Sequence, residues 1–314
     1  MELSRDKSEI SELIRKEAFR LGFSDIGFSN ARFATECEKP LNEWLGNGHH
    51  AGMDYMARNL DKRLNPSLLV EGAKSVVSVL YNYYSNESLT GAPYKIAKYA
   101  YGEDYHDVIK IKLRELSQYI NVNFGEQTQR NFVDSAPVME RFWAQNSGLG
   151  WIGKNSCLIS RKHGSFLFIA EIITSLELEY DVPLNEYCGS CMKCIDSCPT
   201  HAISETRTVN SHQCISYQTI ENHAEIPSEL KGKFADNIFG CDICQDVCPW
   251  NKKAHVHSEP LFSLKKEVLE MTKEGWNNLD EPTFRSIFRK SAVKRTKFKG
   301  LQRNIRFVGI NQSE

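Results

Sequence analysis

Hydrophobic positions recur with two different periods along the first half of the chain. Apolar residues return every third or fourth position over residues 1–22 and 104–122, which is the period of an amphipathic helix. Residues 75–84 and 165–178 are instead nearly continuous runs rich in valine, isoleucine, phenylalanine, leucine and tyrosine, a composition typical of buried strands. The other elements that the pattern predicts are a strand over 23–28 and helices over 44–60 and 138–146.

The pattern changes beyond residue 180. Cysteine dominates from about 181 to 254 and regular periodicity fades, whereas residues 255–314 indicate short helices with a basic end. Because strands alternate with helices before that point, the chain is expected to begin with an α/β layer over 1–180. The predicted fold class is α+β, in three parts: an α/β domain over 1–180, a cysteine-rich domain over 181–254 and a helical segment over 255–314.

Composition adds few restrictions to this picture. The 314 residues are 41% hydrophobic and 25% charged, which is ordinary for a soluble protein of about two domains. The net charge of −1 excludes a global electrostatic signal for nucleic-acid binding, so any such signal must be local. The amphipathic N-terminus lacks the apolar core of a signal peptide, and no run of about eighteen apolar residues exists. A cytoplasmic protein is therefore expected.

The spacing of eight cysteines between residues 188 and 248 indicates electron transfer. One run reads C-x2-C-x2-C-x3-C-P, and the second places a lone cysteine before C-x2-C-x3-C-P. The first run matches the bacterial two-cluster ferredoxin pattern, in which three cysteines bind one [4Fe–4S] cluster and the fourth crosses to the other. The pattern predicts a ferredoxin-like domain with two clusters, one bound by Cys188, Cys191, Cys194 and Cys248 and the other by Cys198, Cys214, Cys241 and Cys244.

Structural zinc and disulfides are the alternatives for these cysteines. A zinc site needs only four ligands in two pairs and has no use for three cysteines at successive steps of three, followed by a fourth and a proline. Disulfides are disfavoured because nothing marks the chain as secreted. Cys37 and Cys157 lie outside the pattern and are expected to pack as small hydrophobic residues.

A glycine-rich segment, 148–154 (GLGWIGK), fits both the dinucleotide-binding and the phosphate-loop patterns. Both patterns should follow a strand and open a helix, whereas this segment follows a helical pattern and leads toward a strand. The phosphate loop also requires Ser or Thr after the lysine, where this chain has Asn155. Two uses remain open: close approach of the backbone to a large cofactor, and a plain tight connection.

Asp134 is the candidate proton donor. It follows the apolar pair Phe132 and Val133 and precedes Ser-Ala-Pro, which is also the signature of a helix start. A carboxylic acid against an apolar surface has a raised pKa and can deliver a proton at neutral pH. The alternative is that Asp134 caps the following helix.

The C-terminal stretch 285–306 carries the local charge signal, because basic residues occur there without an acidic one. A solvated helix face normally mixes charges of both signs, so this stretch favours a footprint for nucleic-acid phosphates. The candidate contacts are Arg285, Arg289, Lys290, Lys294, Arg295, Lys297, Lys299 and Arg303, with Arg306 at the end of the stretch.

Several of these stretches together resemble one family. They are 134–140 (DSAPVME), 148–154, 188–191 (CGSC), 198–203 (CPTHAI), 214–221 (CISYQTIE) and 240–251 (GCDICQDVCPWN). With these residues the chain resembles epoxyqueuosine reductase over about 55–304, and the family is related to the cobalamin-dependent reductive dehalogenases.

The resemblance implies an enzyme of tRNA modification that uses cobalamin and two [4Fe–4S] clusters. It would reduce the epoxide of epoxyqueuosine at the tRNA wobble position to the alkene of queuosine, the last step of queuosine biosynthesis. The family's acid matches Asp134, and the first domain would hold cobalamin. The cobalamin contacts that the resemblance implies are Arg58, Lys98, Asp134, Asn155, Ser156, Ser216 and Tyr217.

The implied partners are the tRNA anticodon stem-loop and an external one-electron donor of the ferredoxin or flavodoxin type, and the chain is expected to be a monomer. Longer family members append a C-terminal helical-repeat region that this sequence does not contain, so the basic stretch is expected to carry more of the tRNA contacts. Two other functions stay open. One is a cobalamin-dependent reductase or dehalogenase of a small molecule, and the other is a ferredoxin-type electron carrier.

Overall fold

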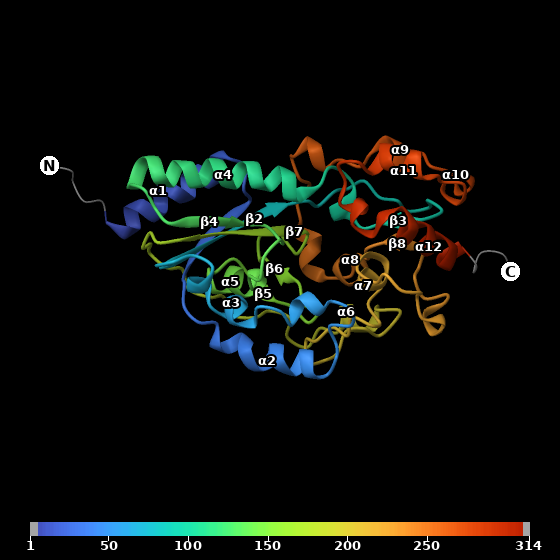
Figure 1. Cartoon of the computed structure of the whole chain (residues 1–314), viewed down its shortest axis with the longest axis horizontal. Helices are drawn as coiled ribbons and strands as arrows, with labels where there is room; N and C mark the ends of the chain where they lie inside the picture. Colours follow the sequence, from blue (N-terminus) through green and yellow to red (C-terminus); the bar gives the residue numbers. More distant parts are fainter. Residues whose placement is uncertain (1–5, 310–314) are drawn as a thin grey trace.

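A four-stranded antiparallel sheet organises the first half of the molecule in the computed structural model, which describes residues 6–309 (Figure 1). The expected α/β layer is thus built on a sheet with no parallel pairs, in keeping with the α+β class. In spatial order the strands are β1 (Asp25–Asn30), β2 (Ser75–Asn82), β7 (Leu167–Thr174) and β4 (Gln129–Phe132).

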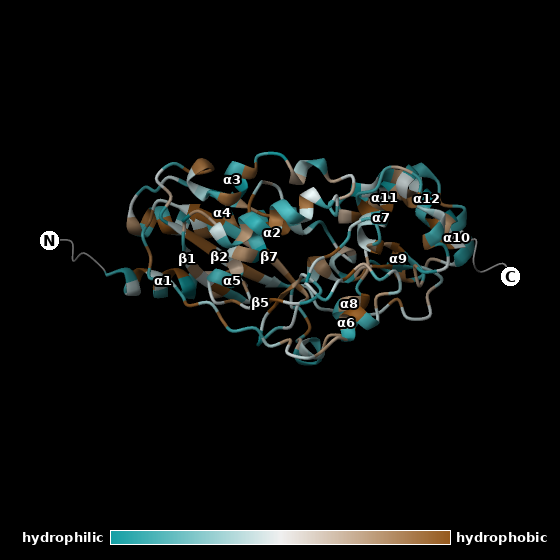
Figure 2. Ribbon diagram, turned by 90° about the horizontal axis from the view of Figure 1, so that it is seen from below, coloured by the Kyte–Doolittle hydropathy of each residue, from teal (hydrophilic) through white to brown (hydrophobic). Residues whose placement is uncertain are grey.

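Helices cover both faces of this sheet (Figure 1). On one face lie α1 (Lys7–Arg20) and α4 (Tyr105–Phe124), whose apolar stripes share one core with alternate residues of β2 and β7. On the other face lie α2 (Thr35–Gly46), α3 (Leu60–Leu64) and α5 (Glu140–Asn146). The strands between these layers are hydrophobic along most of their length (Figure 2). Because side chains alternate along a strand, β7 sends Ile172 toward α1 and α4, and Ile173 toward α5.

The expected helix over 44–60 is wrong. Helix α2 ends at Gly46, and a single 3₁₀ turn, η1 (Asp54–Met56), and the short α3 follow it. Glycines at 46, 48 and 52 lie in the expected helix, and each costs roughly 1 kcal/mol relative to alanine. The apolar residues of this segment therefore pack against the core from successive turns and not from one continuous helix.

A second core fills the other end of the molecule (Figure 1). Its two-stranded sheet pairs β3 (Lys95–Ile96) with β8 (Asn237–Phe239) in parallel. This core joins residues 89–101 to residues beyond 214, so its packing runs across the expected domain boundaries. The helices around it are α9 (Lys266–Leu269), α10 (Lys273–Asn277), α11 (Glu281–Phe288) and α12 (Lys297–Gly309).

Short elements carry the cysteines between these two cores. They are α6 (Lys193–Asp196), α7 (Ile215–Ile220) and α8 (Ile243–Asp246), beside a small hairpin of β5 (Trp151–Ile152) and β6 (Leu158–Ile159). Within residues 6–309 no helix is long and apolar enough to span a membrane.

Candidate active site

The first group of cysteines gathers around α6. Burial raises the pKa of the Cys194 thiol, and charges on Cys188, Cys248 and Cys191 add to this effect, which places all three near Cys194. Cys248 thus joins the first run although it belongs to the second run in the sequence. The indole N–H of Trp151 donates to Cys188 Sγ over 3.4 Å, a kind of contact that tunes a bound cluster's potential.

The second group forms around α8 and the start of α7. Burial raises the pKa of Cys241 to about 12, and charges on Cys214 and Cys198 contribute to this shift. The pKa of Cys244 is raised by a hydrogen bond with Cys157, by burial, and by charges on Cys241 and Cys214. The cysteines that influence one another electrostatically therefore fall into two groups, and the binding of one cluster by each group stays a prediction. Cys157 lies beside the second group, where it forms a hydrogen bond with Cys244.

Eight thiols in two sets suit iron–sulfur clusters, whose ligands are cysteine thiolates. In the part of the chain that the structure describes, no three His, Cys, Asp or Glu side chains converge closely enough to hold a single metal ion. A four-iron cluster spreads its ligand sulfurs farther apart than a single ion does, so this looser grouping is compatible with clusters.

Asp134 lies at the end of β4, in the turn that leads to α5. The Tyr105 hydroxyl donates to Asp134 Oδ2 over 2.7 Å, and the Asp134 backbone N–H donates to Glu140 Oε1 over 2.6 Å. Asp134 has a φ of 45°, an uncommon backbone conformation that these two bonds hold in place. The helix-cap alternative is wrong, because α5 begins at Glu140 with Met139 at its cap position.

Tyr99 links Asp134 to the second cysteine set. Burial raises the pKa of Tyr99, and charges on Asp134 and Asp242 raise it further, so the ring lies within electrostatic reach of both carboxyl groups. Asp242 follows Cys241 directly in the sequence. The Tyr99 ring also meets that of Tyr105 edge-on, with centroids 6.1 Å apart. Asp134 and the second cysteine set are therefore neighbours, with the Tyr99 ring between them.

Charged side chains from other segments lie near Asp134, whose own side chain is exposed. We call them the charged rim. Arg295 donates two hydrogen bonds to the Glu221 carboxylate, at 3.0 and 2.9 Å. Burial raises the pKa of Tyr55 to about 12, and charges on Glu221 and Asp134 contribute to this shift. Arg295 and Tyr55 thus border the same opening.

Three of the residues that the resemblance assigns to cobalamin surround the second cysteine set. Lys98 Nζ is 2.7 Å from Asp246 Oδ1; burial alone would lower the pKa of Lys98, but the carboxylates of Asp242 and Asp246 raise it above its ordinary value. Asn155 is buried, and its amide donates to the Cys244 carbonyl over 3.4 Å. Ser156 Oγ donates to a backbone carbonyl over 2.8 Å.

Besides Asp134, described above, the remaining three residues lie on two facing segments. Ser216 and Tyr217 are on α7, directly after Cys214, and the Tyr217 hydroxyl accepts the N–H of Gly52 over 2.8 Å. Arg58 is exposed, in the turns before α3. The loop that contains Gly52 therefore docks against the cysteine segment.

Two polar atoms in this docked loop have no partner of their own. The ring nitrogens His49 Nδ1 and His50 Nδ1 are buried and form no hydrogen bond within the described residues. A buried polar atom without a partner is costly, so a bound polar molecule is a natural complement. Cobalamin carries several amide groups, and the residues present fit such a ligand.

Several side chains of the basic stretch 285–306 already form ion pairs with acidic residues. Arg285 pairs with Glu281 one turn earlier on α11. Acidic residues from other segments pair with Lys290, Lys294 and Arg295; they are Glu103, Asp104 and Glu221. Arg289, Lys297 and Lys299 are exposed and form no ion pair within residues 6–309. Together with Arg306, they are the exposed members of the basic stretch that pair with no acidic residue in the described part of the chain.

The prediction that Arg303 contacts tRNA is wrong. Its side chain is 8% exposed, and its guanidinium donates to the carbonyls of Asn222 and Gln218 over 2.6 and 2.8 Å. These bonds fix α12 to the end of α7. Arg303 is therefore a structural residue that a phosphate cannot reach.

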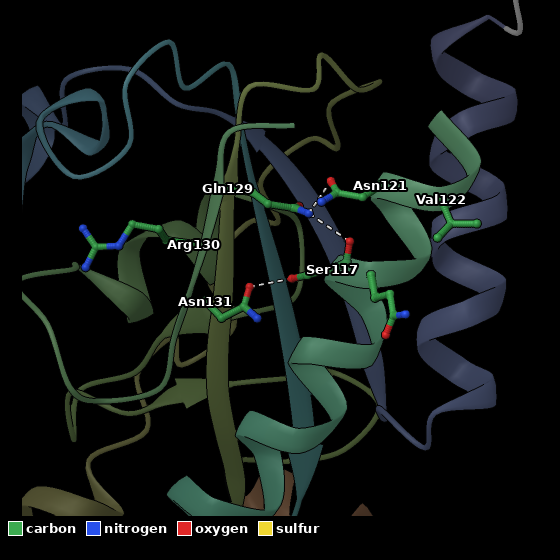
Figure 3. Close-up of a pocket in the computed structure, with 7 residues that line it drawn as sticks. Ser117, Asn121, Val122, Gln129, Arg130 and Asn131 are labelled. Carbon is green, nitrogen blue, oxygen red and sulfur yellow. Dashed lines mark hydrogen bonds between the residues drawn. The ribbon is translucent and has the colours of Figure 1, made fainter. Parts of the chain in front are cut away.

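A groove of about 490 Å³ lies between α4 and β4 (Figure 3). Gln129 bridges its walls, because its side-chain amide donates to the carbonyl of Ser117 and to Asn121 Oδ1. The groove contains no group that the site chemistry uses.

Sequence reasoning missed the partners of Asp134. Tyr105, Tyr99 and Glu221 come from segments far apart in the chain, and no local pattern connects them. Among these partners, only Glu140 could be suspected from the sequence, because it ends the 134–140 stretch that begins with Asp134.

Two family models match the chain. The model described as "4Fe-4S double cluster binding domain" matches residues 187–251, which contain both cysteine sets. The model described as "Epoxyqueuosine reductase QueG, DUF1730" matches residues 63–135, which end just after Asp134.

Relatives match over nearly the full length. An epoxyqueuosine reductase of Cellulophaga algicola is 52% identical over 96% of this chain and 99% of its own. One from Synechocystis is 40% identical over 86% and 94%, and one from Escherichia coli is 36% identical over 92% and 78%.

Solved structures agree with these relatives. An epoxyqueuosine reductase solved with an epoxyqueuosine-modified tRNA stem loop is 29% identical and superimposes with a TM-score of 0.86, over 95% of this chain and 80% of its own. The enzyme from Bacillus subtilis, with "the Asp134 catalytic loop swung out of the active site", is 27% identical with a TM-score of 0.87, over the same shares.

Proposed function

This chain belongs to the epoxyqueuosine reductase family, and from that premise we propose that it reduces the epoxide of epoxyqueuosine in tRNA to the alkene of queuosine. The observation that supports this most strongly is the position of Asp134 beside the second cysteine set, with Tyr99 between them. An acid for the leaving oxygen and a source of electrons therefore serve one site. The proposed place of reaction is the cytoplasm, and the proposed form is a monomer.

The reaction consumes two electrons and two protons and releases the epoxide oxygen as water. The eight cysteines bind two [4Fe–4S] clusters, in the crossed sets described above, and these pass electrons singly from an external ferredoxin- or flavodoxin-type donor. Cobalamin, when bound, supplies a low-potential cobalt centre that protein side chains cannot imitate. Lys98, Asn155, Ser156, Ser216 and Tyr217, with Arg58 at the edge, would hold it.

Asp134 is the proposed general acid. An epoxide oxygen that opens as an alkoxide is a poor leaving group, and a positioned carboxylic acid removes this barrier by protonating it. The Tyr105 hydroxyl, 2.7 Å from Asp134 Oδ2, orients the carboxyl and leaves the other oxygen free for the proton. The solved relative whose catalytic loop carries an aspartate supports this role.

The proposed substrate contacts combine the exposed basic residues with the charged rim. Arg289, Lys297 and Lys299 are free to meet phosphates of the anticodon stem-loop, and Arg295 borders the opening above Asp134. A wobble base that is splayed out of the loop is the usual form in which proteins read single-stranded RNA.

The test is incubation of the reduced, cofactor-loaded protein with tRNA that carries epoxyqueuosine, followed by mass analysis of the nucleosides. We expect the wobble nucleoside to lose one oxygen atom. Clusters without a bound cobalamin in the optical spectrum, and no conversion, would support the electron-carrier alternative. Both cofactors with turnover of a small epoxide or halide, but not of tRNA, would support the small-molecule alternative.

A further inference from the structure

Three carboxyl groups lead from the open site into the centre of the sheet. Asp134 is at the end of β4, Glu140 is the first residue of α5, and Glu171 is in the middle of β7. Asp134 and Glu140 are joined by the 2.6 Å hydrogen bond from the Asp134 N–H to Glu140 Oε1. Glu171 points to the face of the sheet that α5 covers, since its neighbours Ala170 and Ile172 lie in the core on the opposite face.

Glu171 is enclosed without a partner. It is 0% exposed, and neither carboxyl oxygen forms a hydrogen bond within residues 6–309. The residues directly opposite it on the adjacent strands are Ser78 and Phe132, and neither carries a charge. A buried carboxylate with neither hydrogen bond nor counter-ion is strongly disfavoured, and such a group keeps its proton instead.

The charged groups around Glu140 come from three segments besides its own. Burial raises the pKa of Glu140, and a negative charge on Asp134 raises it further. The Asp134 N–H and the guanidinium groups of Arg141 and Arg63 act in the opposite direction and are the smaller effects. Burial also raises the pKa of Glu171, with contributions from Glu140 and Asp134.

We propose that Glu140 and Glu171 hold protons at neutral pH and that Glu140 supplies the second proton of the reaction by reloading Asp134. This inference rests on the proposed function. The first C–O bond breaks with transfer of the Asp134 proton to the epoxide oxygen; an O–H bond of Glu140 then breaks as one forms on Asp134. The reloaded Asp134 protonates the hydroxyl, which leaves as water when the second C–O bond breaks.

The two electrons of this sequence come from the reduced clusters and their external donor. Arg141 and Arg63 stabilise the carboxylate that Glu140 becomes. Glu171 does not give up its proton and takes no part in the transfer.

Three matched Glu→Gln variants test the proposal by activity. In Glu140→Gln the amide oxygen still accepts the Asp134 N–H but no proton is available, so we expect kcat to fall about 100-fold with KM for tRNA unchanged. The wild-type rate should fall as pH rises through the folded-state pKa of Glu140, and this limb should vanish in Glu140→Gln. Glu140→Asp should restore part of the rate. Glu171→Gln and the exposed control Glu177→Gln should stay close to wild type.

Two further readouts do not depend on turnover. Infrared spectra in water and deuterated water should show a protonated carboxyl band that Glu171→Gln removes, a second that Glu140→Gln removes, and no such change in Glu177→Gln. Unfolding against pH should show equal stability of wild type and Glu171→Gln below a pH of about 4.3, the ordinary carboxyl pKa. Above this pH the unfolding free energy of the wild type should fall steadily relative to that of Glu171→Gln, because the unfolded chain releases a proton that the folded protein retains.

A wild-type rate and pH profile in Glu140→Gln would overturn the reloading role. A slow Glu140→Gln with an unchanged pH profile would also overturn it, since that pattern marks a structural defect. The absence of both infrared bands would overturn the protonation of the pair. If the wild type itself fails to convert tRNA, the proposed function fails, while the infrared and stability measurements still report on the two carboxyls.

Discussion

Arginines of the C-terminal stretch show how surroundings decide the role of a residue. Arg303 is enclosed by backbone carbonyls of the segment after α7, whereas Arg289 on the same stretch is exposed. The sequence presents both as equal members of one basic run. The difference arises because Arg303 is on the buried face of α12, which packs on the second core, whereas Arg289 lies directly after α11 at the surface.

Arg303→Ala should therefore destabilise the protein by about 2–4 kcal/mol, because several buried carbonyls would lose their hydrogen-bond donor. Urea unfolding measures this change. The matched Arg289→Ala should change the unfolding free energy by no more than about 0.5 kcal/mol. Equal stabilities of the two variants would contradict the structural role of Arg303.

The residues of the site divide into those that spacing predicts and those that it does not. The eight cysteines follow from their intervals, because a cluster imposes fixed ligand spacing on the chain. Tyr105 and Tyr99 do not, since they meet Asp134 only after α4 has packed on the sheet. Tertiary contacts of this kind leave no periodic trace in the sequence.

At the scale of elements, long periodic segments were predictable and short ones were not. Helix α4 and strands β2 and β7 match the expected ranges within a few residues, because each buries a continuous apolar face. Strands β3 and β8 have two and three residues and carry no alternation to recognise. The antiparallel order of the sheet also depends on pairing between distant strands, which periodicity does not report.

The exposed basic residues at the start of α12 and the end of α11 form the element that should meet tRNA. Charge reversal of Arg289, Lys297 and Lys299 together should weaken binding of the stem-loop. The dependence of log K on log salt should become shallower by about 0.7–0.9 for each phosphate that the variant no longer neutralises. Titrations at several salt concentrations measure both effects.

Lys16→Glu on α1 is the control, because this exposed lysine lies at the other end of the molecule (Figure 1). An unchanged slope in the triple variant, or an equal change in the control, would remove this surface from the tRNA interface.

The whole molecule places two cysteine sets between two apolar cores, and the sets share residues of both runs. Cys198 ends the first run but lies with Cys241 and Cys214, while Cys248 ends the second run and lies with Cys194. Each crossing residue therefore ties one half of the cluster segment to the other.

Loss of either crossing cysteine should disturb both clusters. Cys198→Ala and Cys248→Ala should each lose iron and alter the paramagnetic resonance signals of both reduced clusters, because each run is anchored in both sets. Cys37→Ala, a change on α2 at a side chain that packs against the core beneath that helix, should keep both signals. Selective loss of one cluster with the other intact would contradict this coupling.

The proposed reaction requires Asp134 to deliver a proton at the site where the clusters deliver electrons. A single turnover of reduced protein on epoxyqueuosine tRNA tests it most directly, with wild type, Asp134→Asn and the exposed control Asp107→Asn on α4. We expect normal cluster reduction in all three proteins. Loss of the epoxide oxygen should be at least about 100-fold slower in Asp134→Asn alone. Conversion by Asp134→Asn at the wild-type rate would contradict it.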